Sequence, residues 1–281
     1  MVWIGKNFMN IDLHCHTSLS DGTLTPTELV NLAVQRELDM LAITDHDSID
    51  CYQQIDPSSH TFSLITGIEF STTWHNTGVH IVGLNIDLKN KALVDGVRRQ
   101  SVARHQRAVA IAEKLDQFGY SNTLEGAKSF TSGGQIGRPH FAQYLVQIGA
   151  VSTVQQAFKK YLGSGKVGDI KEQWASLEEV VLWIRSAGGV AVLAHPTKYK
   201  MTRTKLCSLL EDFIAVGGEA MEVISGSQTS SVTSSMAGLC QKYNLLASLG
   251  SDFHSPEQPW AALGQVPNLP PNCHPVWTRW Q

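Results

Sequence analysis

Histidine and carboxylate side chains in this chain stand where short apolar runs end, and that placement restricts the folds available to it. The runs IDL, MLAI, SLIT, VAVLA and LLASLG have the length and composition of buried strands. Side chains at the ends of neighbouring strands converge in space even when they are far apart in the sequence. The residues that share this placement are His14, His16, Asp21, His46, Glu69, His80, His195, Asp252 and His254.

These nine side chains predict a metal site. Imidazoles and carboxylates are ligands that divalent metal ions accept. A single histidine at a strand end is usually a packing or hydrogen-bonding residue. Six histidines and three acids that repeat one placement are hard to explain without metal, so we expect more than one ion.

The spacing of several candidates supports this interpretation. His14 and His16 are two residues apart, so on a strand both rings face the same side, although buried polar alternation would explain this pair alone equally well. Asp252 and His254 repeat the spacing. Glu69 lies within the apolar run LITGIEFS, where a glutamate is costly unless it is paired or coordinated. We therefore expect Glu69 to bridge two ions.

Two acids beside His46 have other expected roles. Asp45 is predicted to orient a ligand imidazole through a hydrogen bond. Asp47 is predicted to cap a helix.

The alternation of strand and helix patterns predicts an α/β fold. Helices are expected over 26–37 and 176–186, each opened by a capping box, and over 202–216 and 230–243. Such alternation implies a mostly parallel sheet, open or closed into a barrel, and 281 residues suit one barrel-sized domain. The strands are expected near 10–14, 40–44, 62–68, 79–86, 190–194, 220–224 and 245–250.

The stretch from 89 to 169 breaks this rhythm, because it predicts consecutive helices near 90–118, 138–148 and 152–162 with no strand between them. We interpret it as a helical, substrate-binding insertion. The remaining ranges, 1–88 and 170–281, would form the barrel with the metal site.

Basic residues of this insertion are candidates for binding phosphate. Arg104 and Arg107 share a helical face, which is either a solvated surface or a phosphate clamp. Arg138 precedes Pro139, which suits the first turn of a helix, where free N–H groups attract anions. Lys166 lies in GSGKVG, which is not a phosphate-binding P-loop. Two aromatics near the metal ligands, Phe70 and Trp74, either stack on a base or belong to the core.

Composition excludes several classes of protein. A net charge of −3 argues against non-specific coating of long nucleic acid. Five cysteines without a CxxC pair favour a reducing compartment. No apolar stretch approaches the roughly 18 residues of a membrane span, so we expect a cytoplasmic protein, with no obligate protein partner evident.

The motifs HCHTSLSDGTLTPTELV, LAITDHDSI, GIEFST, HIVGL, AHP and GSDFH together resemble the polymerase and histidinol phosphatase (PHP) family over nearly the whole chain. This resemblance implies a distorted (β/α)7 barrel with three divalent ions, Mn²⁺ first and Fe²⁺ or Zn²⁺ as alternatives. It implies that His14, His16, Glu69 and Asp252 hold one ion, that Glu69, His80 and His195 hold a second, and that Asp21, His46 and His254 hold a third.

The segments GRPHFAQYLV and AFKKYLGSGK resemble a bacterial subgroup that acts on RNA 5′ ends and on nucleoside 3′,5′-bisphosphates. The implied activity is a 5′-3′ exoribonuclease and bisphosphate phosphatase that uses metal-activated water. The implied catalytic residues are Glu69, His195 and Asp252, and the implied phosphate contacts are Arg104, Arg107, Arg138, His140 and Lys166. The alternatives are a phosphatase of histidinol phosphate or free nucleotides, and a non-catalytic metal-binding module.

Overall fold

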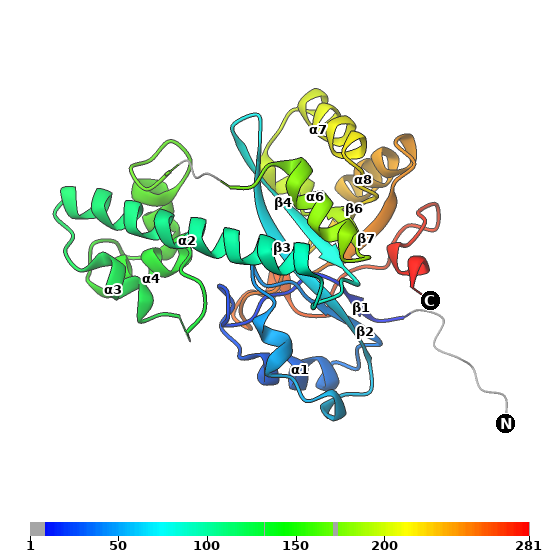
Figure 1. The fold of residues 1–281 in the computed structure, drawn as a ribbon, viewed down its shortest axis with the longest axis horizontal. Coiled ribbons are helices and arrows are strands. Elements are labelled where there is room, and N and C mark those ends of the chain that lie inside the picture. The colour runs from blue at the N-terminus through cyan, green and yellow to red at the C-terminus, as the bar shows by residue number, and fades with distance from the viewer. Residues whose placement is uncertain (1–8, 132, 171–173, 281) are drawn as a thin grey trace.

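The computed structural model describes residues 9–131, 133–170 and 174–280. Its centre is a seven-stranded sheet whose strands follow chain order (Figure 1). All neighbours are parallel except β4, which is antiparallel to both β3 and β5. The strands are β1 (Ile11–Asp12), β2 (Met40–Ile43), β3 (Ser63–Trp74), β4 (Thr77–Leu84), β5 (Val190–Leu193), β6 (Ala220–Ser225) and β7 (Leu246–Gly250).

The two edges of the sheet approach each other, so the sheet is a nearly closed barrel. Leu13 N–H donates to Leu249 O at 3.2 Å, and Asp252 N–H donates to His14 O at 2.8 Å. The reversed strand distorts the barrel. β3 and β4 form a hairpin whose turn residues, His75 and Asn76, have φ of 43° and 62°, as a type I′ turn requires. The expected distorted α/β barrel is therefore confirmed.

Four helices cover the outside of the sheet: α1 (Pro26–Gln35), α6 (Leu177–Ser186), α7 (Arg203–Ala215) and α8 (Ser230–Lys242). The predicted capping boxes are present, Thr25 with Glu28 on α1 and Ser176 with Glu179 on α6. Short 3-10 turns lie at Asp50–Gln53, Pro57–Ser59, Pro196–Tyr199, Pro259–Ala261 and Val276–Arg279. Across the described residues, no helix combines the length and the apolar character that crossing a membrane requires.

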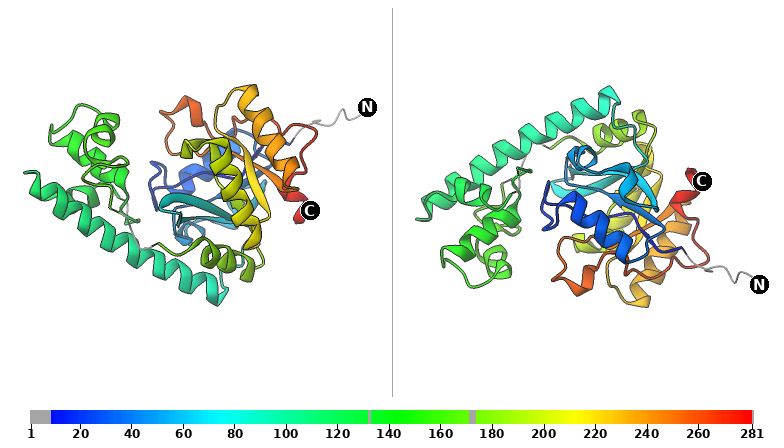
Figure 2. Two further views of the ribbon diagram at one scale, coloured as in Figure 1. Left: turned by 90° about the horizontal axis from the view of Figure 1, so that it is seen from above. Right: turned by 90° about the horizontal axis from the view of Figure 1, so that it is seen from below.

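The helices between β4 and β5 extend to one side of the barrel (Figures 1 and 2). They are α2 (Lys91–Gln117), α3 (Thr123–Lys128), α4 (Arg138–Gln147) and α5 (Val154–Ala157), followed by a π-helical turn at Phe158–Leu162. α3 was not predicted; its N-cap residue, Asn122, makes no side-chain capping bond.

Helix α2 belongs to two apolar cores. Leu93 near its start is fully buried in the large core of the barrel. Ile111 and Leu115 near its end pack in a separate core with Phe141 and Leu145 of α4. One continuous helix therefore joins the barrel to the other helices of this segment.

Candidate metal centre

The nine predicted ligands meet at one end of the barrel. Their donor atoms form four overlapping groups, within each of which the atoms lie no more than 4.8 Å apart. The groups are His14, His16 and Asp252; His14, Glu69 and His195; His46, Glu69 and His80; and His16, Asp21, His46 and His254.

One set of four donor atoms has the spacing of ligands around a single ion. His14 Nε2 lies 3.2 Å from His16 Nε2, and both nitrogens lie 3.3 Å from Glu69 Oε2. Asp252 Oδ1 lies 3.5 Å from His14 Nε2 and 3.2 Å from His16 Nε2. Ligands about 2.1 Å from a metal are about 3.0 to 3.4 Å apart in octahedral or tetrahedral geometry. The spacings measured here therefore suit ligands of one divalent ion.

The second oxygen of Glu69 faces another pair of imidazoles. Glu69 Oε1 lies 2.9 Å from His80 Nδ1 and 2.8 Å from His195 Nε2, and these two nitrogens are 3.3 Å apart. The two oxygens of one carboxylate thus serve two ligand sets, which is the geometry of a bridging ligand.

A third set is wider. Asp21 Oδ1 lies 3.3 Å from His254 Nε2, and Asp21 Oδ2 lies 3.8 Å from His46 Nε2. The rings of His16 and His254 stack with their centroids 4.2 Å apart. This set has room for an ion between Asp21 and the two imidazoles.

Several donor atoms in the centre have no hydrogen bond within the part of the chain that the structure describes. The buried donor atoms of the centre without a hydrogen-bond partner in that part of the chain are Glu69 Oε2, Asp21 Oδ1 and His46 Nδ1. His46 Nδ1 and Glu69 Oε2 are only 2.9 Å apart, but they are not aligned as donor and acceptor. Buried polar atoms without partners are rare and call for an explanation. A bound cation accounts for all three, so the donor set fits divalent metal.

Proton equilibria in the metal-free centre follow from burial and mutual charge. Burial opposes ionisation of Glu69, but His46, His80 and His14 hold its pKa well below the ordinary value. Burial lowers the pKa of His16 to about 3, and His254 reinforces the effect. Burial also acts against protonation of His254, yet Asp21 raises its pKa to about 9. Neutral His16 is ready to ligate, whereas His254 must lose a proton first.

Glu222 on β6 contacts two candidate ligands and was not predicted from the sequence. Its Oε1 lies 2.5 Å from His14 Nδ1, and its Oε2 accepts from the N–H of His195 at 2.6 Å. It therefore fixes the ring of one candidate ligand and the backbone of another. Its signal was an acid within the apolar strand AMEVIS, the same signal that identified Glu69.

Unusual backbone conformations occur at two candidate ligands, and a glycine packs against a third. His195 and Asp252 have φ of 28° and 55°, a region that non-glycine residues rarely adopt. At Gly250, a Cβ would lie 2.3 Å from that of His14, so only glycine lets the end of β7 approach this ligand.

The two acids beside His46 differ from expectation. Asp45 does not orient an imidazole; its carboxylate accepts from Thr17 N–H at 2.7 Å, Thr17 Oγ1 at 2.6 Å and Ser20 Oγ at 2.7 Å. It therefore folds the loop that carries Asp21. Asp47 caps no helix, because the nearest helical turn begins at Asp50 after Ile49.

Asp47 instead connects the metal centre to α2. Its carboxylate accepts from Ser71 N–H at 2.8 Å, Gln100 Nε2 at 2.9 Å and Arg104 Nε at 2.6 Å. Its own N–H donates to Glu69 O at 2.9 Å. Asp47 therefore fixes the position of Arg104 relative to Glu69.

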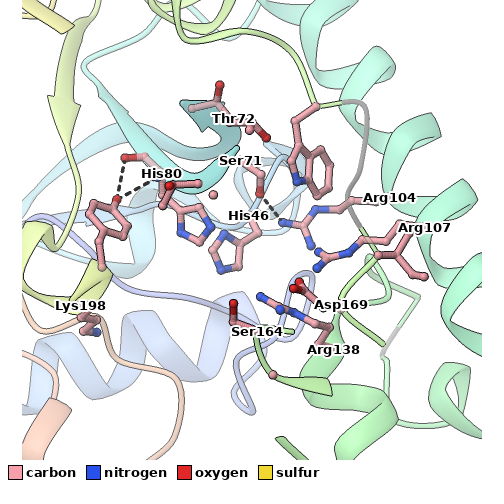
Figure 3. A pocket seen from close by; sticks show the side chains of 18 of the residues that line it. His46, Ser71, Thr72, His80, Arg104, Arg107, Arg138, Ser164, Asp169 and Lys198 are labelled. Carbon is pink, nitrogen blue, oxygen red and sulfur yellow. Dashed lines mark hydrogen bonds between the residues drawn. The ribbon is translucent and has the colours of Figure 1, made fainter. Parts of the chain in front are cut away.

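A cleft of about 700 Å³ opens over the centre. His46 and His80 line its floor, and Arg104, Arg107 and Arg138 line its far side (Figure 3). His195 also lines the cleft. Arg104 uses Nε and Nη2 for Asp47 and Ser71, so Nη1 is left without a hydrogen bond to a described residue. Arg138 opens α4 next to Pro139, as predicted.

Trp174 also lines this cleft, although it was not among the predicted residues. The guanidinium carbons of Arg104 and Arg107 lie 5.4 Å and 5.6 Å from its ring centroid. Phe70 and Trp74, the two aromatics named from the sequence as possible base-stacking residues, do not line the cleft. Phe70 is fully buried, and Trp74 is buried with its Nε1 donating to Asp212 at 2.7 Å.

Two of the five predicted phosphate contacts lie outside the cleft lining. His140 is buried, and its Nδ1 accepts from the N–H of Gly137 at 2.9 Å, so it caps α4. Lys166 lines an adjoining hollow with Lys159, and that hollow shares Phe158, Gly163 and Ser164 with the cleft. Their assignment as phosphate contacts stays a prediction.

Comparison with known proteins adds independent findings. The family model described as PHP domain matches residues 12–189. The chain is 41% identical to the 5′-3′ exoribonuclease Rnm of Escherichia coli, over 96% of this chain and 93% of the relative. It is also 41% identical to a 3′,5′-nucleoside bisphosphate phosphatase of Chromobacterium violaceum, over 95% of this chain and 95% of the relative.

Two solved structures are similar throughout. An amidohydrolase from Chromobacterium violaceum, with bound sulfate and no metal, superposes with a TM-score of 0.90 at 40% identity, covering 96% of this chain and 95% of that one. A Bifidobacterium adolescentis protein classed as a metal-dependent phosphoesterase gives a TM-score of 0.78 at 26% identity, covering 96% of each chain.

Proposed function

This chain belongs to the PHP domain family, and from that premise we propose that it is a metal-dependent phosphoesterase that removes nucleotides from the 5′ end of RNA and also hydrolyses nucleoside 3′,5′-bisphosphates. The observation that carries the proposal is a single cleft with a cluster of metal-type ligands at its floor and three arginines at its far side. This arrangement suits a substrate with two phosphates, of which one reacts and the other is held.

The two activities named for the relatives become one reaction if the substrate has a single orientation. The arginines would hold the 5′-phosphate of the first nucleotide through bidentate contacts. The phosphorus on its 3′ oxygen would then lie at the ligand cluster. A nucleoside bisphosphate ends at that phosphorus, whereas an RNA continues beyond it.

The bond that breaks is the same in both substrates. Water attacks the phosphorus, its oxygen forms the new bond, the bond from phosphorus to the 3′ oxygen breaks, and one proton from the water ends on the departing oxygen. The bisphosphate yields a nucleoside 5′-phosphate and inorganic phosphate. RNA yields a nucleoside 5′-phosphate and a shorter RNA that again begins with a 5′-phosphate, ready for the arginines.

Each group of side chains has a defined part in the proposal. The nine candidate ligands would hold three divalent ions, with Mn²⁺ as the first choice and Fe²⁺ or Zn²⁺ as alternatives. Bound ions would lower the pKa of the attacking water and offset charge on the phosphoryl oxygens. Glu69, His195 and Asp252, proposed as catalytic, would hold the ions in place beside the reacting phosphoryl group. Trp174 offers its ring to the first base.

The test compares three substrates: a 5′-phosphorylated RNA ladder, a nucleoside 3′,5′-bisphosphate and histidinol phosphate. We expect shortening of the RNA from its 5′ end, release of nucleoside 5′-phosphates and phosphate release from the bisphosphate. Preferential turnover of histidinol phosphate would contradict the proposal and support a small-molecule phosphatase.

A pair of variants separates catalysis from mere metal storage. Glu69→Ala should lose bound metal and hydrolysis together, because Glu69 contributes an oxygen to two ligand sets. Glu178→Ala, which removes an exposed acid of α6, should change neither quantity. Hydrolysis that survives in Glu69→Ala would rule out the proposed site.

A further inference from the structure

Basic side chains border the cleft at two ends. Arg104, Arg107 and Arg138 lie on one side of His46 and His80, whereas Lys198 lies on the other side (Figure 3). The ammonium group of Lys198 contacts the carboxylate of Asp252, so this end adjoins the ligand cluster directly.

Lys198 begins a strongly basic stretch, residues 198–205, which we call the basic segment. It holds four cationic side chains and no acid, in the order Lys198, Lys200, Arg203 and Lys205. Lys205 Nζ donates to Thr77 Oγ1 at 3.0 Å, and Thr77 itself lines the cleft next to the tip of the β3–β4 hairpin. The segment therefore begins at the ligand cluster, at Lys198, and reaches the hairpin again at Lys205.

The cations of this segment are available to an anionic ligand. Lys200, Arg203 and Lys205 are exposed, and none forms an ion pair with any residue in the described ranges. Their other contacts are with uncharged groups: Arg203 Nη1 donates to Ser235 Oγ of α8 at 3.1 Å, and Lys205 Nζ lies 5.9 Å from the centroid of the Trp74 ring. The nearby acid Asp212 is already engaged, because it accepts from Trp74 Nε1 at 2.7 Å and lies 3.6 Å from His75 Nε2. An uncompensated row of cations beside a phosphoesterase centre is the pattern that tracks a polynucleotide backbone.

Direction follows from the proposed function, on which this inference rests. With the 5′-phosphate at the arginines and the reacting phosphorus at the ligand cluster, the rest of an RNA must leave at the end away from the arginines. That end is the basic segment. We propose that the basic segment binds the phosphates of the RNA chain on the 3′ side of the reacting phosphorus, so that it selects oligonucleotides over mononucleotides.

The decisive experiment compares two substrates that differ in whether RNA continues on the 3′ side of the reacting phosphorus. A nucleoside 3′,5′-bisphosphate ends at the ligand cluster, whereas a 5′-phosphorylated decaribonucleotide continues past it. The variant is Lys200→Ala/Arg203→Ala/Lys205→Ala, which leaves Lys198 intact. We expect its kcat/KM on the decamer to fall roughly 10- to 100-fold near 0.05 M salt and its kcat/KM on the bisphosphate to stay within about twofold.

Salt dependence gives a second readout. Each lost phosphate contact on a single strand should reduce the slope of log(kcat/KM) against log salt by about 0.7, so three lost contacts should reduce it by about 2. The matched control is Lys89→Ala/Arg98→Ala/Lys114→Ala, which removes the same charges from residues outside the cleft lining. It should leave both substrates and the salt slope close to those of the parent enzyme.

A third variant tests the direction. Lys159→Ala/Lys166→Ala removes the cations of the hollow at the arginine end. Because Lys166 is a predicted contact of the 5′-phosphate, which both substrates carry, we expect this variant to lower kcat/KM on the decamer and on the bisphosphate by a similar factor. A loss on the decamer alone would overturn the inference, because the chain would then leave by that end.

Two other sets of results distinguish failure of this inference from failure of the proposed function. Equal loss on both substrates, or an unchanged decamer rate in the basic-segment variant, would overturn the inference and leave the proposed function intact. If the parent enzyme hydrolysed the bisphosphate but no RNA, the exoribonuclease function and this inference would both fail.

Discussion

Replacing Asp47 by alanine should destabilise the protein and misplace Arg104 without removing any candidate metal ligand. The carboxylate of Asp47 is fully buried and accepts three hydrogen bonds, from Ser71, Gln100 and Arg104. Arg104 is only 8% exposed, so its charge would remain buried without a partner. Removing one member of a buried ion pair costs about 3 to 5 kcal/mol, whereas an exposed pair contributes at most about 1 kcal/mol.

Urea unfolding of the metal-free protein measures this cost. We expect Asp47→Ala to lower the free energy of unfolding by about 3 to 5 kcal/mol. Asp95→Ala, which removes an exposed acid 2.5 Å from Lys91 Nζ, should leave it close to that of the parent protein. Adding Arg104→Met to Asp47→Ala should restore part of the loss, because no unpaired charge remains.

Kinetics on the nucleoside 3′,5′-bisphosphate provide the functional readout. Asp47→Ala should keep its bound metal but lose about 10- to 100-fold in kcat/KM, since a misplaced guanidinium binds phosphate poorly. A stability loss below about 1 kcal/mol, or strictly additive effects of the two substitutions, would refute the view that Asp47 holds a buried charge in place.

Four further predictions concern the centre and the cleft. Glu222→Gln should weaken metal binding about 10- to 100-fold in competition with a chelator, because Glu222 uses both oxygens, for the His14 ring and the N–H of His195, and an amide has one oxygen and no charge; unchanged affinity would contradict this role. Trp174→Ala should raise KM for base-containing substrates about 5- to 100-fold and Trp174→Phe much less, if a base stacks there. Because Asp21 raises the pKa of His254 to about 9, the metal affinity of this set should rise about tenfold per pH unit up to that value, with one proton released in calorimetry. The Asp21–His254 pair stabilises the metal-free protein fully below pH 6.5, and this contribution should disappear as the pH rises through about 9.

The candidate ligands could be found from the sequence because each combines two local signals. An apolar run gives a strand, and a histidine or acid at its end gives the chemistry. His14 and Asp252 follow the ends of β1 and β7, and Glu69 lies within the long strand β3, past the end of the predicted strand 62–68. The three are far apart in the chain, yet their side chains meet. Glu222 carried a similar signal, but its role depends on which neighbour faces it, and the sequence does not contain that information.

Other features depend on tertiary contacts alone. Asp47 looks like a capping residue because an acid after a strand often precedes a helix, and only the position of α2 makes it a partner of Arg104. Trp174 lies outside any regular element, and the two arginines that flank it come from α2. The reversal of β4 follows from a two-residue turn at His75 and Asn76, where neither residue is glycine. Local propensity does not specify such a turn.

Helix α2 carries Arg104 and Arg107 in its middle and is anchored in the barrel core near its start. At about 1.5 Å and 100° per residue, one inserted residue before Arg104 would turn both guanidiniums away from the cleft. A whole inserted turn would keep them facing it but shift them about 5.4 Å along the helix axis. The length of α2 before Arg104 therefore sets where the arginines stand relative to the ligand cluster, and it can change without turning them away only by whole turns.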